Sequence, residues 1–332
     1  MKRITISEVA KLANVSKTTV SRVINNKPDI SPETRKKVLE VMDEYSFKPN
    51  AYATAVSNRK TKTIGLITPQ GTGNIYTNPF YSRVLHGIAT EITEQGYYLM
   101  FSYIENDDYI DVFERHMVDG FVLLSPGVED KKIVDKLKAI NAPFISTTVL
   151  PGLDDHSYID IDNYHAASIA VKHLLALGHK NIMIINSFST LLSNKHRLKG
   201  YRDALKEKGI APKEELIFEG EPIFETGFGI VMSQPELPTA IFACSDMIAL
   251  GAIEAIKKRG KQVPTDISVV GFDDIHLAGN FGLTTIRQPI LEKGKIAAKM
   301  LINKIEGKEI EVSKLEVQLI DRRTTKAVRE EH

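Results

Sequence analysis

A run of basic, hydroxyl and amide side chains between residues 16 and 25 has the residue types and spacing to read nucleic acid. If this segment is helical with Val20 and Val23 buried, its opposite face carries Lys17, Thr18, Ser21, Arg22 and Asn25. Arginine and lysine can pair with guanine O6 and N7, threonine can contact a thymine methyl group, and serine and asparagine can hold phosphates. The pattern therefore predicts a helix face that contacts DNA.

Three short helices are expected to position this face. Thr5 and Glu8 have the spacing of a capping box for a helix over about 6–13. Ser16 can cap a second helix after a turn of three or four residues, which is helix-turn-helix spacing. Ser31, followed by proline, opens a third helix. The alternative is a three-helix bundle that only packs on the body or on a partner.

Charge is distributed unevenly along the chain. Residues 1–62 carry 13 Lys and Arg against 6 Asp and Glu, a balance of +7, whereas the remaining 270 carry 30 against 36, a balance of −6. A basic head on a mildly acidic body is typical of a nucleic-acid-binding domain attached to a domain with another role. The alternative is a head whose charges are merely solvated.

Length and composition limit the class of protein. A chain of 332 residues predicts two or three domains, and 42% hydrophobic with 26% charged residues argues against disorder. No apolar run approaches the roughly 20 residues of a membrane span, and the first residues do not resemble a signal peptide. The single cysteine, Cys244, cannot form an intrachain disulfide. We therefore expect a cytoplasmic protein.

From residue 63 onward, short apolar strands alternate with amphipathic helices. The expected strands are TIGLIT, YYLMFSY, GFVLLS, PFIST, NIMIIN, AIFACS and ISVVGF, and the expected helices lie near 80–95, 129–140, 163–177, 194–208 and 246–259. Apolar strands alternating with helices predict parallel sheets covered on both faces. Two such sets, about 62–160 and 161–288, predict two doubly wound subdomains with a ligand cleft at the carboxyl ends of their strands.

The motifs VSKTTVSRVIN and FKPNAYA closely resemble the lactose-repressor (LacI) family of bacterial transcription regulators. The resemblance continues through the body in LLALGHKNI, HRLKGYRDAL, PTAIFACSDMIALGAI, VPTDISVVGFDDI and TTIRQP. It implies a periplasmic-binding-protein-like α/β body behind an all-α helix-turn-helix head. The implied boundaries are 1–49 for the head, 50–61 for a hinge helix and linker, and 62–332 for an effector-binding and dimerisation domain, divided into subdomain 1 (62–160 and 290–318) and subdomain 2 (161–288 and 320–330).

The resemblance also implies individual roles at the DNA. Base edges would be read by Lys17, Thr18 and Arg22, and phosphates would be held by Ser16, Ser21, Asn25, Ser31, Thr34 and Asn50. In the family a hinge helix enters the minor groove, and its residues here are Ala53 and Val56. Val56 stands where the family has a leucine wedge, so we expect weaker operator bending or a different central sequence.

An effector pocket is implied at Phe80, Thr148, Arg197, Ser245, Asp273 and Gln288. Arg197 could fork onto paired hydroxyls or a carboxylate and Asp273 could accept from hydroxyls, with a structural salt bridge as the alternative. Phe80, Tyr81 and Phe272 could stack on a sugar or simply pack in the core. The stretch TGNIYTNPFYSRVLHGI looks similar to maltose-type regulators of Gram-positive bacteria, which makes an α-glucoside the first candidate; another sugar or a purine would fit the same fold.

One segment departs from the family pattern. Between the Gly-aromatic pair at 227–228 and PTAI, only Ile230 to Ser233 remain before QPELP, so we expect the helix there to be shortened to about one turn.

The sequence thus predicts a homodimeric repressor of sugar-utilisation genes that binds a pseudo-palindromic double-stranded DNA operator under control of a sugar. The ending DRRTTKAVREEH lacks a leucine heptad, which favours a dimer over a tetramer. The alternative is a catabolite-control-type regulator with a corepressor partner. A sugar receptor or an enzyme is disfavoured, because no phosphate-loop, dinucleotide, zinc-protease or nucleophile-elbow motif occurs. We predict no catalytic residue, cofactor, metal or membrane partner.

Overall fold

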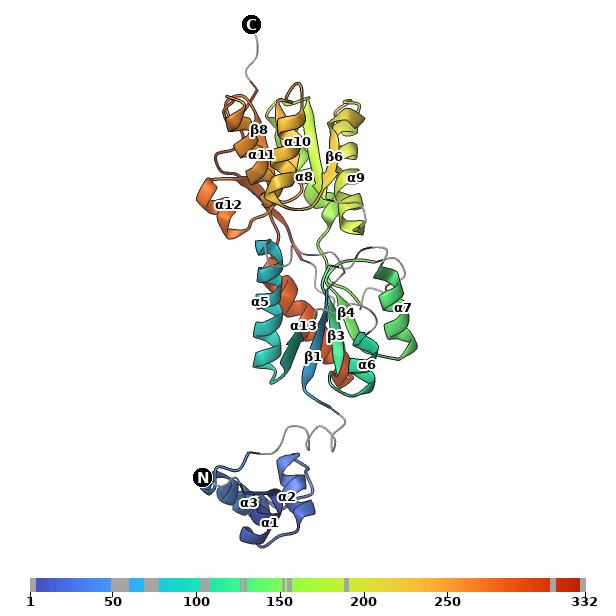
Figure 1. Ribbon diagram of the computed structural model, residues 1–332, viewed down its shortest axis with the longest axis vertical. Helices are drawn as coiled ribbons and strands as arrows, with labels where there is room; N and C mark the ends of the chain where they lie inside the picture. The colour runs from blue at the N-terminus through green and yellow to red at the C-terminus, as the bar shows by residue number, and fades with distance from the viewer. Residues whose placement is uncertain are drawn as a thin grey trace.

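The computed structural model describes residues 4–48, 60–68, 78–101, 108–125, 127, 130–150, 153, 157–187, 191–310 and 315–328. Figure 1 shows a three-helix head at one end and an α/β body containing two sheets. The predicted fold class, an all-α head with a body of doubly wound parallel sheets, is confirmed. Asn50, Ala53 and Val56, and with them the predicted hinge helix, lie outside the described residues.

The head consists of α1 (Ile6–Leu12), α2 (Lys17–Ile24) and α3 (Pro32–Glu44). The predicted capping box is present, since the Thr5 and Glu8 side chains each bond the other residue's backbone N–H. The Ser16 hydroxyl accepts from the Thr19 N–H at 3.0 Å and caps α2. A small core of buried valines and alanines joins the three helices: Val9, Ala10, Ala13, Val20, Val23 and Val38.

The first sheet of the body is parallel, with the order β2-β1-β3-β4. Its strands are β1 (Thr63–Ile67), β2 (Tyr98–Phe101), β3 (Gly120–Leu123) and β4 (Phe144–Ser146), and its helices are α5 (Pro79–Glu94), α6 (Asp108–Glu114), α7 (Lys131–Ala139) and α13 (Ile290–Glu306). A Cβ at Gly87 would lie 2.0 Å from the Leu291 carbonyl oxygen, and one at Gly294 would lie 2.2 Å from that of Val84. These glycines therefore allow α13 to pack directly on α5, far from it in sequence.

The second sheet has the order β10-β9-β8-β7-β5-β6 and is parallel except for β10. Its strands are β5 (Ile182–Ser187), β6 (Ile217–Gly220), β7 (Ala240–Ala243), β8 (Ser268–Asp273), β9 (Thr284–Arg287) and β10 (Gln318–Ile320). Around them lie α8 (Asn163–Ala176), α9 (Leu192–Glu207), η3 (Glu214–Leu216), α10 (Phe224–Ser233), α11 (Asp246–Lys258) and α12 (His276–Phe281). The chain crosses between the two sheets after β4, after β9 and after α13.

The expectation of a one-turn helix before QPELP is wrong. The helix α10 runs over ten residues, Phe224–Ser233. It begins three residues before Gly227, which serves as a contact point between helices: a Cβ there would lie 2.0 Å from the Ile248 carbonyl oxygen of α11. Gly251 of α11 makes the reciprocal approach, since a Cβ there would lie 1.9 Å from the Phe224 carbonyl oxygen. The close packing of α10 on α11 thus explains Gly227 and Gly251.

Candidate DNA interface and effector pocket

The second helix of the head presents the predicted polar face to solvent. Lys17, Thr18 and Arg22 are exposed, while Val20 and Val23 on the other side are buried. Arg22 forms an ion pair with Asp29, and both side chains are about half exposed. The structure therefore places the three predicted base-reading residues on one accessible face, with Arg22 already paired.

The residues predicted to hold phosphates lie at helix ends and beside α2. Ser31 caps α3 and accepts from the Thr34 N–H at 3.2 Å, as Ser16 does at α2. Helix N-termini favour anions because their N–H groups point outward and the helix dipole is positive there. The Asn25 amide donates to the Ser21 hydroxyl at 3.4 Å, so these two side chains lie together on α2.

Sequence reasoning missed a residue that holds the turn after α2. The Arg35 guanidinium donates to the Asn26 side-chain oxygen at 2.7 Å and to the Lys27 carbonyl at 2.6 Å. Arg35 thereby ties α3 to the end of the DNA-facing helix. The sequence contained a signal for this role, because Arg35 lies three residues before the buried Val38 and therefore on the inner side of α3.

In the body, Asp273 and Gln288 form a buried hydrogen-bonded pair at the ends of β8 and β9. The Gln288 amide donates to Asp273 Oδ1 at 2.6 Å. Burial raises the pKa of Asp273 to about 7, and the positive charge of Arg197 opposes the rise. Asp273 has a φ of 116°, a strained value for a residue other than glycine.

Arg197, on α9, is held by neutral groups. Its Nε donates to the Asn163 side-chain oxygen at 2.9 Å, and Nη1 donates to the Cys244 carbonyl at 2.8 Å. The guanidinium lies 3.8 Å from the centre of the Phe272 ring. Among the described side chains Arg197 forms no ion pair, so the alternative of a structural salt bridge with Asp273 does not hold. Phe272 is fully buried and packs in the core.

Thr148 belongs to a buried charged cluster that sequence reasoning missed. Its hydroxyl donates to Asp160 Oδ2 at 2.9 Å, and Lys293 Nζ donates to Asp160 Oδ1 at 2.8 Å. Both charged side chains are about 95% buried. Burial alone would raise the pKa of Asp160, but Lys293, with help from Thr148 and the Ile161 N–H, holds it below its ordinary value.

The remaining predicted pocket residues play partly structural roles. The Ser245 hydroxyl caps α11 by accepting from the Ile248 N–H at 3.2 Å. Phe80 is half-buried at the start of α5, with its ring edge-on to Tyr81 at 5.2 Å. Burial, and secondarily the Asp273 carboxylate, raise the pKa of Tyr81 to about 12. The start of α5 therefore approaches the Asp273 end of β8.

The structure thus brings Arg197, Asp273 and Gln288 together with Tyr81, the neighbour of Phe80, in one region between the sheets. Lys293 belongs to the same region, because its charge also opposes the rise in the pKa of Asp273. The site offers guanidinium and amide donors, a carboxylate acceptor and aromatic edges, which suit a polar molecule with several hydroxyls. Over the described ranges, no group of three His, Cys, Asp or Glu side chains is placed to hold a metal ion. No described helix has the length and apolar character to cross a membrane.

Comparison with known proteins gives consistent matches for head and body. The family model for bacterial regulatory proteins of the lacI family matches residues 5–50, and that for the periplasmic binding protein-like domain matches residues 171–325. Catabolite control protein A of Priestia megaterium is 32% identical, with 93% of this chain and 95% of that protein aligned. The HTH-type transcriptional repressor PurR of Mannheimia succiniciproducens is 31% identical, with 98% and 99% aligned.

Two solved structures are similar over nearly the whole chain. The lac repressor dimer bound to operator and the anti-inducer ONPF has a TM-score of 0.82 at 27% identity, covering 98% of this chain and 100% of that chain. The transcriptional regulator CelR in complex with cellobiose has a TM-score of 0.73 at 29% identity, covering 97% and 100%. With an exposed polar face on α2, a two-sheet body and these relatives, the chain is a DNA-binding transcriptional regulator and belongs to the lacI family of bacterial regulatory proteins.

Proposed function

We propose that this regulator represses sugar-utilisation genes and that a neutral sugar controls its operator affinity. The observation that carries the proposal is the grouping of half-buried Arg197 with buried Asp273 and Gln288. Their donors and acceptor lie together, and Arg197 has no counter-ion among the described side chains. Hydroxyl groups can both donate to a carboxylate and accept from a guanidinium, so a polyol complements this set. Cellobiose in CelR and ribose in a regulator from Enterococcus faecium support a sugar. An α-glucoside is our first candidate.

The exposure of Lys17, Thr18 and Arg22 supports roles for these head residues at the DNA. Lys17, Thr18 and Arg22 read base edges in the major groove. Phosphates are held by hydroxyl and amide side chains at the ends of α2 and α3 and on α2 itself, Ser16, Ser21, Asn25, Ser31 and Thr34, and by Asn50, which lies outside the described residues. In the cleft, Phe80, Thr148 and Ser245 complete the wall around Arg197, Asp273 and Gln288. No catalytic residue or cofactor belongs to this scheme, and a protein that binds the bacterial chromosome acts in the cytoplasm.

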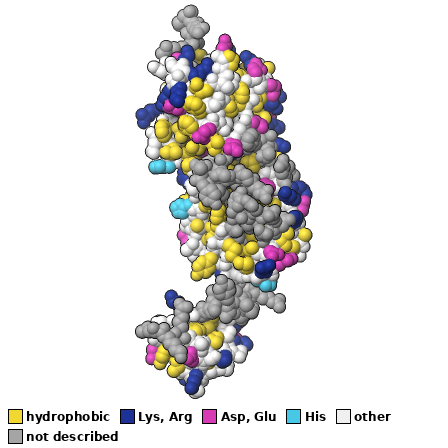
Figure 2. Space-filling model, viewed as in Figure 1, with side chains coloured by type: hydrophobic (Ala, Val, Ile, Leu, Met, Phe, Trp, Pro, Cys, Tyr) yellow, Lys and Arg dark blue, Asp and Glu magenta, His cyan; other side chains and the backbone are white. Residues whose placement is uncertain are grey.

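A homodimer is supported by exposed apolar side chains on two elements of the body. Tyr98 and Phe101 lie on the edge strand β2, and Leu277 and Phe281 lie on α12, with Tyr98 71% and Phe281 61% exposed. Apolar patches also interrupt the charged surface of the body on the face in Figure 2. A large apolar residue on an edge strand favours pairing with another chain. Two copies joined there would present two heads to a pseudo-palindromic operator.

The proposed mechanism is a population shift. A sugar that contacts Arg197 from one sheet and α5 from the other favours one relative orientation of the subdomains, divided as 62–160 with 290–318 and 161–288 with 320–330. That orientation changes how the segments at 50–61 of two protomers meet the DNA. A preference of about 1–3 kcal/mol changes operator affinity roughly 5- to 150-fold. The similarity to catabolite control protein A supports the alternative that a partner protein acts as corepressor.

The test is a fluorescence-anisotropy titration of the full chain on operators selected from a random palindrome pool, at two salt concentrations and with a panel of mono- and disaccharides. We expect selective binding with a steep salt dependence that one sugar changes. Asp273→Asn should keep operator binding and lose the sugar response, whereas Arg22→Met should reduce the preference for the selected operator by about 1–3 kcal/mol. Selective binding without a sugar response favours the corepressor alternative, and absence of selective binding overturns the proposal.

A further inference from the structure

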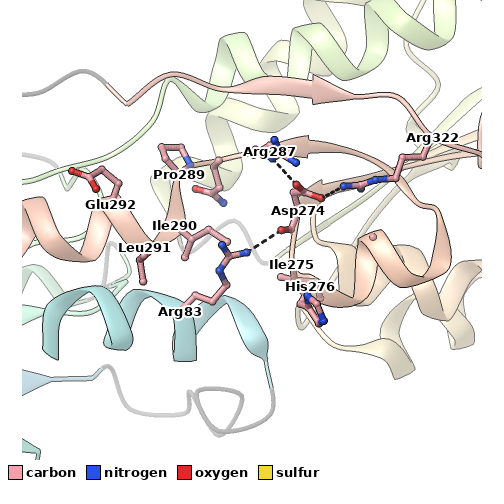
Figure 3. Close-up of a pocket in the computed structure, with 12 residues that line it drawn as sticks. Arg83, Asp274, Ile275, His276, Arg287, Pro289, Ile290, Leu291, Glu292 and Arg322 are labelled. Atoms are coloured by element: carbon pink, nitrogen blue, oxygen red, sulfur yellow. Dashed lines mark hydrogen bonds and ion pairs between the residues drawn. The ribbon is translucent and has the colours of Figure 1, made fainter. Parts of the chain in front are cut away.

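A second polar cavity adjoins the proposed effector pocket. It has a volume of about 450 Å³ and lies where α5 and the start of α13 face the ends of β8 and β9 (Figure 3). Gln288 lines it, and its charged and imidazole side chains are those of Arg83, Asp274, His276, Arg287, Glu292 and Arg322. Small-molecule sites usually measure roughly 300–1,000 Å³, so the cavity is large enough for a metabolite.

Three guanidinium groups converge on one aspartate in this cavity (Figure 3). Arg287 Nε donates to Asp274 Oδ2 at 2.6 Å, and Arg322 Nη2 donates to Asp274 Oδ1 at 2.7 Å. Arg83 donates only to the Asp274 backbone carbonyl, at 3.2 Å. Since Glu292 is the other lining carboxylate, the lining carries an excess of positive charge.

The arginines differ in how firmly they are held. Arg322 is 20% exposed and also donates to the Leu283 carbonyl, so it supports the wall of the cavity. Arg287 is 52% exposed, and its bond to Asp274 uses Nε, which leaves both terminal nitrogens available to a ligand. Arg83 is exposed on α5. Arg83 and Arg287 are therefore the two arginines best placed to bind an anion.

We propose that this cavity binds a small metabolite carrying a phosphoryl group, held by Arg83 and Arg287, which acts as a second effector. Planar guanidinium groups match the oxygens of a phosphate and bind it with charge-assisted hydrogen bonds. The ligand bridges α5, which packs with the first sheet, and β9 of the second. Its binding thus stabilises the relative orientation of the two sheets seen here.

The cavity shares its strand ends with the sugar site, which provides the coupling. Asp273 and Asp274 are consecutive residues, with φ of 116° and 56°. Asp273 accepts a hydrogen bond from Gln288, and Asp274 accepts one from Arg287. These two donors are also consecutive in the sequence. An anion that draws Arg287 away from Asp274 acts directly on the backbone that holds the Asp273–Gln288 pair. The regulatory part of this inference rests on the proposed function, whereas anion binding does not.

The binding test uses the full-length protein in a thermal-denaturation titration with glycerol 3-phosphate, with glycerol as the uncharged control, at constant ionic strength. We expect a saturable rise in the melting midpoint with glycerol 3-phosphate alone. Arg83→Met and Arg287→Met should each weaken the apparent Kd about tenfold or more, the loss of one charge-assisted hydrogen bond. Arg115→Met is the matched control, because Arg115 pairs with the exposed Asp111 on α6.

Inorganic phosphate is the second probe. If phosphate binds with the same Kd as glycerol 3-phosphate, the phosphoryl group accounts for all of the affinity. If phosphate binds with a weaker Kd, the organic portion of the ligand contributes part of the affinity. A non-saturating rise that is the same in all variants is a general salt effect and overturns the proposal. Operator binding is then measured with and without glycerol 3-phosphate, and a change of roughly 5-fold or more is expected in the wild type alone. Saturable binding without that change overturns the effector role. Loss of operator binding in the absence of phosphate would instead contradict the proposed function.

Discussion

The DNA-facing helix of the head and the polar cluster between the two sheets differ in what their side chains contact. On α2, Lys17 and Thr18 are exposed, and the ion pair of Arg22 with Asp29 is half in solvent. Between the sheets, Lys293 and Asp160 are almost fully buried and bonded to each other. The polar side chains of a DNA-binding surface can remain hydrated until DNA binds.

A pocket for a small molecule has to satisfy its buried polar groups internally, because each unpaired one costs free energy. Arg197 bonded to Asn163, and Gln288 bonded to Asp273, are examples. A sugar must therefore replace buried bonds, whereas DNA binds exposed side chains and displaces at most the half-exposed ion pair of Arg22 with Asp29. The difference predicts that substitutions in the pocket change stability first, and that substitutions on α2 change binding first.

The largest effect is expected from breaking the buried pair. Lys293→Met leaves the Asp160 carboxylate buried without its cation, and we expect a loss of about 3–5 kcal/mol in the free energy of unfolding. Since the folded pKa of Asp160 is lowered, this stabilisation is present above its unfolded pKa, roughly pH 4, and is lost as the pH falls below it. Urea denaturation at pH 7 measures the loss.

The matched control is Lys131→Met, whose partner Asp135 is exposed, and its cost should stay below about 1 kcal/mol. The double variant Lys293→Met with Asp160→Asn removes both charges and should recover most of the loss. A Lys293→Met protein no less stable than Lys131→Met would show that the contrast between buried and exposed sites does not hold.

A second expected effect tests whether Asp273 is held protonated by the pocket. With a folded pKa of about 7, Asp273 keeps a proton between about pH 4 and 7 that the unfolded chain has released, so wild-type stability falls as the pH rises through this range. Asp273→Asn removes that dependence. We expect its free energy of unfolding relative to wild type to be more favourable at pH 8 than at pH 5, by on the order of 2–3 kcal/mol.

Asp203→Asn serves as the control for this pH comparison, because Asp203 pairs with Lys199 on the surface of α9. Its difference from wild type should not change between pH 5 and pH 8. An equally flat difference for Asp273→Asn would mean that Asp273 is ionised throughout, and that the pocket carries a fixed negative charge.

The same contrast explains how much of the molecule could be predicted from sequence. The capping residues Thr5, Ser16 and Ser31, and the exposed face of α2, follow from spacing within a few residues, which a sequence displays directly. Seven of the ten described strands were predicted for the same reason, whereas β6, β9 and β10 were not among them. The length of α10 was mispredicted because it was judged from the few residues between Phe228 and QPELP, whereas the helix begins at Phe224 and packs on α11 through Gly227.

The contacts of the buried polar residues in the pocket could not be predicted from local sequence spacing. Lys293 and Asp160 are 133 residues apart, so no local pattern indicates that each is buried against the other. Family resemblance marked Thr148, but the partner of its hydroxyl is Asp160, a residue that the resemblance did not mark. Ser245 was expected in the pocket wall, and its hydroxyl caps α11. Long-range partners of buried polar groups depend on the whole fold and cannot be read from spacing.

The smallest of these effects is expected on α2 and concerns binding. Arg22→Met should cost about 1–3 kcal/mol of discrimination between the preferred operator and a scrambled duplex, the usual value of one bidentate base contact. Its effect on stability should be small, because the ion pair with Asp29 is half exposed. Anisotropy titrations on the two duplexes measure both affinities.

Asp29→Asn provides the opposing variant, since it removes the anion that competes with DNA for Arg22. We expect tighter binding to both duplexes and unchanged discrimination, because a carboxylate repels every phosphate backbone alike. Lys36→Met on the exposed side of α3 is the control for loss of one positive charge. If Arg22→Met weakens both duplexes equally, Arg22 contacts phosphate and does not read a base. The discriminating contacts would then belong to Lys17 and Thr18, whose side chains are exposed on α2 and are not fixed by an ion pair to the described residues of the head.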